Sequence, residues 1–126
     1  MPGLTCQTVG IQIGSLSLFC VCLSTGEVPG GVKWVEECLP PDDYEGYAEI
    51  KRKIGHLCMV TCGEHEYTRY GFRQLLEGKC CDVIQPDITW CGGITEARRI
   101  CALAAAYDVP VIPHGSSVYS YHLQAS

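Results

Sequence analysis

From residue 32 onward, short apolar runs alternate with longer segments whose apolar residues have a helical spacing. The apolar runs are rich in β-branched side chains and are bounded by Gly, Pro or acidic residues. They cover residues 32–36, 57–62, 81–85 and 109–112. This pattern is typical of buried parallel strands. We therefore predict four such strands.

Between these runs, the pattern predicts three helices, over residues 42–54, 67–76 and 95–107. Asp42 and Asp43 can cap the first helix, and Gly78 ends the second. Strands and helices that alternate with short connections indicate an α/β fold with a parallel sheet and right-handed crossovers.

Each predicted strand ends close to an acidic residue or a histidine. In chain order these residues are Glu36, Glu64, Asp87 and His114, at intervals of 28, 23 and 27 residues. Each interval is about the length of one βα unit, which takes roughly 30 residues. An exposed loop acid or a helix cap would explain any one of them. Four such residues at regular intervals favour a ligand-binding site, since ligands of α/β folds bind at the carboxyl ends of the strands.

The residue types at these positions indicate metal-assisted proton transfer. Glu36 and Glu64 would repel each other, and a hard cation such as Mg²⁺ relieves that repulsion. Such an ion binds a substrate carboxylate and stabilises an enolate formed beside it. His114 has the side chain suited to proton transfer near neutral pH, and Asp87 can accept a hydrogen bond from its other ring nitrogen.

The chain length limits the possible fold, and the net charge excludes one class of binding partner. At 126 residues the chain is one domain or part of one, and it is too short for a complete (β/α)8 barrel of about 250 residues. We predict a partial barrel of the TIM type with about four βα units. Nine Lys and Arg residues against 14 Asp and Glu residues give a net charge of −5, which argues against nucleic-acid binding through bulk charge.

The first 26 residues contain no charged side chain. Residues 9–24 are mostly apolar, but this run is short for a membrane span of about 20 residues, and no basic segment of a secretory signal precedes it. Its alternation at Ile11 and Ile13 is compatible with a strand. We predict that residues 1–31 form a segment separate from the domain at 32–126, in preference to a signal peptide, and we expect a cytoplasmic protein without membrane contact.

The chain contains ten cysteines. Several lie inside apolar runs, where a free thiol behaves as a small hydrophobic side chain. We therefore favour reduced thiols over a disulfide scaffold. Cys62 and His65 have the spacing of half a zinc site, without a matching second half. A metal-binding module built from Cys62, His65, Cys80 and Cys81 stays a less favoured alternative.

Four segments match the motifs of a known family. They are KWVEECLPPDDY at 33–44, TCGEHEYT at 61–68, IQPDITWCGG at 84–93 and PHGSSVYS at 113–120. Through these motifs the chain resembles the mandelate racemase-like branch of the enolase superfamily, and within it the L-rhamnonate dehydratases. The resemblance implies a sugar-acid substrate that loses its C2 proton and its C3 hydroxyl, giving a 2-keto-3-deoxy acid.

The resemblance also implies roles for individual residues. Glu36 and Glu64 would be Mg²⁺ ligands, and His114 would act as the general base or acid, paired with Asp87. His65, next to a ligand, would line the substrate pocket. Trp90 belongs either to the core or to the pocket wall, and because it directly follows a motif we favour the pocket wall and a contact with substrate.

The chain also departs from the family pattern. The family has a third metal ligand, an Asp on the strand before Glu36, but no Asp or Glu precedes Glu27 here. The family's capping domain and its other barrel strands have no counterpart. We therefore expect a truncated, inactive form. The alternative is a non-catalytic fragment that binds or regulates a longer barrel chain through its open edge. Formation of a homo-oligomer is a further possibility that the sequence does not decide.

Overall fold

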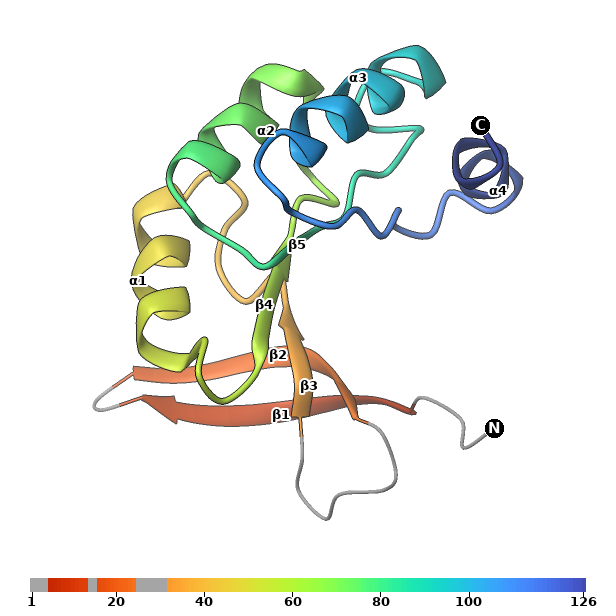
Figure 1. Cartoon of the computed structure of the whole chain (residues 1–126). Coiled ribbons are helices and arrows are strands. Elements are labelled where there is room, and N and C mark those ends of the chain that lie inside the picture. Colours follow the sequence, from red (N-terminus) through yellow and green to blue (C-terminus); the bar gives the residue numbers. More distant parts are fainter. Residues whose placement is uncertain (1–4, 14–15, 25–31) are drawn as a thin grey trace.

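The computed structural model describes the backbone of residues 5–13, 16–24 and 32–126, and the side chains from residue 32 onward. The elements, in chain order, are β1 (Thr5–Ile13), β2 (Leu16–Ser24), β3 (Val32–Glu36), α1 (Tyr44–Ile54), β4 (Met59–Cys62), α2 (Thr68–Glu77), β5 (Val83–Ile84), α3 (Ile94–Ala105) and α4 (Val118–Gln124). Figure 1 shows α1, α2 and α3 arranged along the parallel strands, whereas α4 lies apart from them near the carboxyl end.

The sheet has the strand order β1-β2-β3-β4-β5. β3, β4 and β5 are parallel, with Trp34 paired to Met59 and Thr61 paired to Val83. This part confirms the predicted α/β class. β1 and β2 form an antiparallel pair, and β2 is antiparallel to β3, so the amino-terminal segment contains two strands where the sequence indicated at most one. The separation of residues 1–31 from the following domain stays a prediction.

The fourth predicted strand is reduced to one bridge. Val111 makes an isolated parallel bridge with Ile84, and besides the flanking hydrogen bonds of that bridge the backbone has one more, from His114 N to the Pro86 carbonyl at 3.1 Å. Pro110 and Pro113 lie on either side of it. Because proline has no N–H to donate, Pro110 in this segment and Pro86 in the facing segment interrupt the ladder. The segment nevertheless brings the residue after Pro113 to the same edge as the ends of β3 and β4.

The three predicted helices are present with small shifts at their ends. α1 is capped by Asp43, whose Oδ1 accepts a hydrogen bond from Gly46 N at 2.9 Å. α2 ends before Gly78, as predicted. The short helix α4 was not predicted. In the described part of the chain, no helix is both long enough and apolar enough to cross a membrane.

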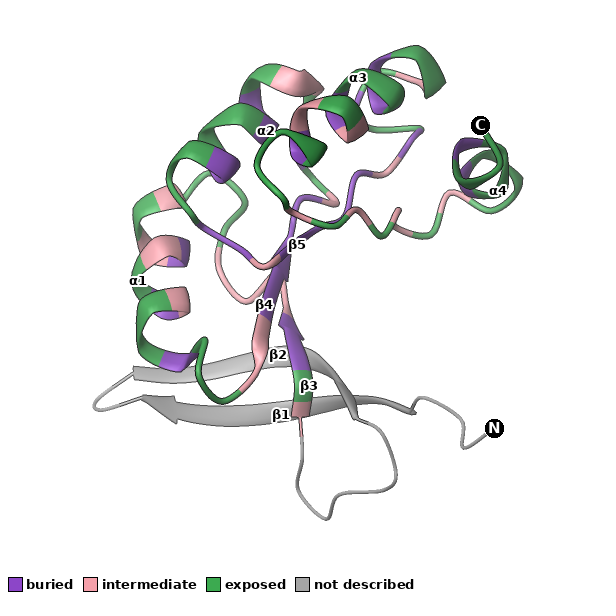
Figure 2. Ribbon diagram, viewed as in Figure 1, coloured by how far each residue is buried: buried purple, intermediate pink, exposed green. Residues whose placement is uncertain are grey.

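The hydrophobic core lies between the parallel strands and the inner faces of α1, α2 and α3 (Figure 2). It includes the thiols of Cys62, Cys80, Cys81 and Cys91, which are unbridged. Burial is the main cause that raises the pKa of Cys80 and that of Cys91 to about 11. The thiols of Cys80 and Cys91 are therefore protonated packing groups.

Candidate active site at the carboxyl ends of the strands

Three of the predicted site residues meet at one edge of the sheet. Glu36 is the last residue of β3, Glu64 follows the end of β4, and His114 follows the bridge at Val111. One potential ligand atom from each of these three side chains lies within 4.8 Å of the other two. The common direction of the parallel strands produces this meeting, as expected from the spacing in the sequence.

Glu36 is oriented by its own strand. Its Oε2 accepts a hydrogen bond from Trp34 Nε1 at 3.0 Å. In a strand, residues i and i+2 lie on the same face, so the indole can hold the carboxylate without a turn of the backbone. One oxygen of Glu36 is thereby positioned by the strand that carries it.

Asp87 holds the His114 imidazole through Oδ2, which lies 3.2 Å from Nδ1. Its other oxygen, Oδ1, accepts from the Ser116 hydroxyl at 2.5 Å and from the Thr89 hydroxyl at 2.6 Å. Burial alone would raise the pKa of Asp87, but the hydrogen bonds from Ser116, Thr89 and His114 outweigh it and lower the pKa to about 2. Asp87 is therefore an ionised acceptor that keeps a hydrogen on Nδ1 of His114.

The second ring nitrogen of His114 faces Glu64. Nε2 lies 3.1 Å from Glu64 Oε2, a hydrogen-bonding distance when Nε2 carries a hydrogen. Withdrawal of Glu64 toward a cation would leave Nε2 available to accept a proton. The geometry thus places a base nitrogen directly beside a candidate metal ligand.

Glu37 is a further candidate residue that the sequence pattern did not single out. Its Oε2 lies 2.5 Å from His65 Nδ1, and Glu37, Glu64 and His65 form a second group of potential ligand atoms within 4.8 Å. Burial and the nearby Glu64 carboxylate raise the pKa of Glu37, although its hydrogen bond with His65 acts in the opposite direction. That hydrogen bond is the main cause that raises the pKa of His65. The consecutive acids at the strand end were the only signal in the sequence.

Trp90 lies beside His65. Its Nε1 donates to the backbone carbonyl of His65 at 3.0 Å, and the two rings are in an edge-to-face arrangement with centroids 5.4 Å apart. The ring of Tyr67 lies 5.3 Å from the Trp90 ring. The structure therefore brings the two predicted pocket residues into contact, while their contact with substrate stays a prediction.

The donor types in both groups are carboxylate oxygens and imidazole nitrogens. Two carboxylates that converge from adjacent strands fit a hard cation such as Mg²⁺. No cysteine belongs to either potential ligand group found among residues 32–126. The described part of the chain therefore lacks the cluster that the cysteine-rich metal module would need.

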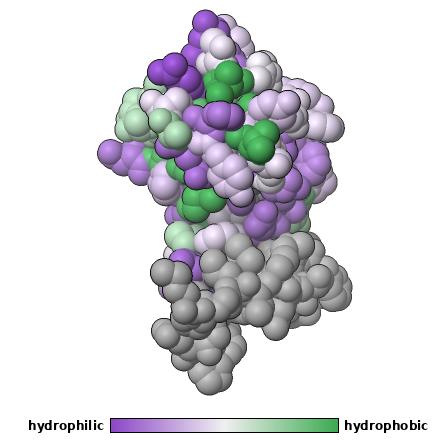
Figure 3. Space-filling model, turned by 90° about the vertical axis from the view of Figure 1, so that its right-hand side faces the viewer, coloured by the Kyte–Doolittle hydropathy of each residue, from purple (hydrophilic) through white to green (hydrophobic). Residues whose placement is uncertain are grey.

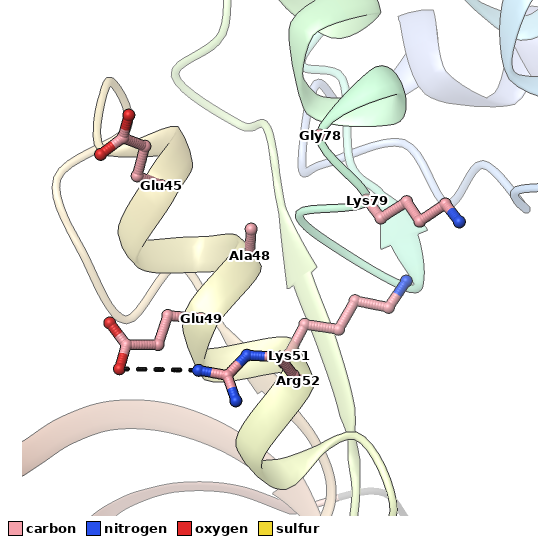
Figure 4. Close-up of a pocket in the computed structure, with 7 residues that line it drawn as sticks. All are labelled: Glu45, Ala48, Glu49, Lys51, Arg52, Gly78 and Lys79. Carbon is pink, nitrogen blue, oxygen red and sulfur yellow. Dashed lines mark ion pairs between the residues drawn. The ribbon is translucent and has the colours of Figure 1, made fainter.

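A separate open pocket of about 620 Å³ lies between α1 and the turn after α2 (Figure 4). It contains none of the candidate site residues. Both acidic and basic side chains line it, with Glu49 paired to Arg52. Lys51 contacts the Asp82 carboxylate at 3.2 Å and donates to the Cys81 carbonyl at 2.6 Å. Glu49, Arg52 and Lys51 are thus paired within the chain, and the two charged lining residues without an ion pair among the described residues, Glu45 and Lys79, have opposite charges.

Comparison with known proteins identifies the family. The model of the family described as Enolase C-terminal domain-like matches residues 26–126. The chain belongs to this family. The resemblance drawn from the four sequence motifs is thereby confirmed.

Solved structures of the superfamily agree with the fold. The chain is 59% identical to the L-rhamnonate dehydratase of Gibberella zeae over 74% of this chain and 24% of that one, with a TM-score of 0.70. A structure described as the rhamnonate dehydratase of the same organism complexed with Mg matches at 59% identity over 74% and 23%, with a TM-score of 0.69. The 3,6-anhydro-D-galactonate cycloisomerase of Zobellia galactanivorans matches at 36% identity over 75% and 28%, with a TM-score of 0.70. This family member thus spans about a quarter of the length of these relatives.

Proposed function

We propose that this chain supplies the metal-binding and proton-transfer residues of a magnesium-dependent sugar-acid dehydratase of the L-rhamnonate type. The main support is the meeting of Glu36 and Glu64 with the Asp87-bound imidazole of His114 at one sheet edge. The 59% identity to the L-rhamnonate dehydratase of Gibberella zeae supports the substrate class.

Glu36 and Glu64 are the proposed Mg²⁺ ligands. A relative in complex with Mg supports this assignment, as does the oxygen-rich donor set. When bound, the ion supplies positive charge opposite the negative charge that develops on the substrate carboxylate. The neighbouring strand β2 contains no acidic residue, so we expect this chain to contribute two carboxylates and to bind the ion weakly.

His114 is the proposed base and acid. It takes the C2 proton of the sugar acid at Nε2, while Asp87 retains the hydrogen on Nδ1. The imidazolium then gives the proton to the C3 hydroxyl, which leaves as water, and the resulting enol tautomerises to a 2-keto-3-deoxy acid. His65 and Trp90 are the proposed substrate contacts beside this centre.

Turnover by the 126-residue chain alone is not expected. The side chains of His114 and His65 are 41% and 48% exposed, so water reaches the groups that must transfer and receive protons. Weak binding of Mg²⁺ by only two carboxylates also lowers the turnover expected of the chain alone. The proposal is therefore that these residues work only where further protein covers the edge.

A chimera tests the proposal. Residues 33–122 replace the matching segment of the Gibberella zeae enzyme, and release of 2-keto acid from L-rhamnonate with Mg²⁺ is measured for the chimera and for the chain alone. We expect turnover only in the chimera, with a loss of at least about 100-fold on His114→Asn and none on the control His56→Asn, an exposed histidine. A folded chimera without turnover would contradict the assigned roles, and robust turnover by the chain alone would contradict its inactivity.

Exposed apolar side chains near the carboxyl end favour a non-catalytic binding role as the second candidate. Ile112, beside the last bridge, and Val118 and Tyr121 of α4 are exposed. Figure 3 shows hydrophobic surface among polar side chains on the side of the molecule that carries α4. Size-exclusion chromatography of the chain mixed with a longer family member tests this role. Elution of the two proteins as separate species would rule out stable binding to that member.

A further inference from the structure

Glu37 combines three features that are unfavourable for stability. Its backbone φ is +39°, in the left-handed region that non-glycine residues rarely adopt. Its side chain is only 11% exposed. Its Oε1 is buried and has no hydrogen-bond partner in the described part of the chain. Strain and an unpaired buried oxygen both cost free energy, so a contribution to stability does not explain this residue.

The hydrogen bond of Glu37 Oε2 is directed at one atom, Nδ1 of His65, at 2.5 Å. Glu64 Oε1 lies 3.5 Å from the same nitrogen. A hydrogen on Nδ1 therefore faces two carboxylate acceptors, whereas a lone pair there would face two negative charges. The arrangement favours the Nδ1–H form of the ring.

The other ring nitrogen of His65 points away from this contact. Among the described residues, Nε2 has no hydrogen-bond partner, and the side chain is 48% exposed. Trp90 restricts the ring through its edge-to-face contact and through its hydrogen bond to the His65 carbonyl. In the neutral ring with its hydrogen on Nδ1, Nε2 carries a lone pair and accepts hydrogen bonds only.

We propose that Glu37 is a positioning residue, which holds the hydrogen on Nδ1 of His65 so that Nε2 of the neutral ring accepts a hydrogen bond from a substrate hydroxyl. An acceptor nitrogen binds a hydroxyl and disfavours a carbonyl or ether oxygen at the same place. This inference rests on the proposed function to the extent that a hydroxylated acid occupies the space beside His65. It makes His65 a determinant of hydroxyl recognition, set by a carboxylate behind it.

The pairing resembles that of Asp87 with His114, with one difference. Asp87 has donors on both of its oxygens, since Ser116 and Thr89 bind the oxygen that His114 leaves free. Glu37 has a donor on one oxygen only. A side chain kept for packing alone would not leave a buried oxygen unpaired, so the difference supports a positioning role for Glu37.

The tautomers of His65 and His114 can be measured in the intact chain. Long-range ¹H–¹⁵N spectra of the ¹⁵N-labelled protein at alkaline pH, where the rings are neutral, distinguish Nδ1–H from Nε2–H. We expect Nδ1–H as the major form of His65 in the unmodified chain. In Glu37→Leu we expect Nε2–H, which an unconstrained histidine side chain favours, with His114 unchanged as an internal reference. The control Glu45→Leu alters an exposed acid of α1 and should change neither ring.

The proposal is overturned by an Nε2–H form of His65 in the unmodified chain, or by an unchanged Nδ1–H form in Glu37→Leu. Should Glu37→Leu fail to fold, Glu37→Gln keeps the size of the side chain, and a lowered Nδ1–H fraction is expected. Thermal unfolding adds a second readout, since a positioning role predicts a melting temperature that stays equal or rises in Glu37→Leu, and a structural role predicts a fall. These measurements need neither substrate nor turnover, so failure of the dehydratase assay and failure of this inference are separate results.

Discussion

His114 and Asp87 form a pair in which Nδ1 lies 3.2 Å from Oδ2, and both hydroxyl donors on Asp87, from Ser116 and Thr89, bind its other oxygen. The two oxygens of one carboxylate therefore have separate tasks. Oδ1 accepts the hydrogen bonds of Ser116 and Thr89, and Oδ2 orients the imidazole of His114. The orientation of His114 is thus set by the chain itself before any ligand binds.

Replacement of Asp87 by Asn should lower the free energy of unfolding at neutral pH by about 2 kcal/mol. Burial opposes the charged form, but the hydrogen bonds from Ser116, Thr89 and His114 lower the pKa from 3.8 to about 2. Because the folded-state pKa lies below the unfolded-state value, the stabilisation is present above a pH of about 4 and is lost as the pH falls toward 2. Urea unfolding of both proteins over a pH series measures this dependence.

The matched control for this series is Asp42→Asn, which removes an exposed carboxylate next to α1. It should leave the unfolding free energy nearly unchanged at every pH. The difference between the unmodified chain and Asp87→Asn should shrink on acidification. A difference that stays constant down to the lowest pH would show that Asp87 does not stabilise the fold through its charge.

A hydrogen bond from Tyr44 connects α1 to the segment that follows Glu64. The Tyr44 hydroxyl donates to Glu66 Oε2 at 2.6 Å, and the other oxygen of Glu66 accepts from Tyr67 N at 2.7 Å. Glu66 is only 8% exposed, so Tyr44→Phe leaves a buried carboxylate oxygen without its donor. We expect a loss of about 1–3 kcal/mol in urea unfolding. Tyr121→Phe, at a side chain that is 70% exposed, should cost almost nothing, and equal losses in the two variants would argue against this role.

The meeting of the site residues followed from the sequence because strand direction is a strong constraint. Glu36, Glu64 and His114 come together at one edge, and Asp87 reaches His114, as the regular spacing implied. A buried parallel strand has a recognisable composition, and its carboxyl end can then lie only at one edge of the sheet. The chemical roles of these residues stay predictions.

The sequence could not indicate Glu37 or the full extent of the strands. Alternation along a strand places consecutive side chains on opposite faces, and continued alternation would direct Glu37 away from Glu36. A left-handed backbone at Glu37 ends that alternation, and nothing about a glutamate predicts it. The bridge at Val111 replaces a strand because prolines flank it, and the short α4 lacks a long periodic pattern.

Asp43 and Asp42 allow a direct test of helix capping. Asp43 accepts a hydrogen bond from Gly46 N at 2.9 Å and thereby binds one of the free N–H groups in the first turn of α1. Asp43→Ala should lower the unfolding free energy by about 1 kcal/mol. Asp42→Ala should have little effect, because the neighbouring acid does not cap the helix. Urea unfolding measures both, and equal losses would mean that general charge near the helix, and not the cap, stabilises α1.

Two overlapping ligand groups are available for a cation, and Glu64 belongs to both. One group adds Glu36 and His114, and the other adds Glu37 and His65. We expect Glu64→Gln and Glu36→Gln each to weaken Mg²⁺ binding at least about tenfold, since even residues behind the direct ligands affect affinity by that much.

Glu37→Gln should weaken Mg²⁺ binding less than either of these substitutions, because the hydrogen bond of Glu37 Oε2 is made to His65 and not to the ion. Isothermal titration calorimetry of the variants measures the affinities, with the exposed Glu49→Gln as the control. Strong weakening by Glu37→Gln together with unchanged binding in Glu36→Gln would place the ion in the second group. That result would contradict the assignment of Glu36 as a ligand.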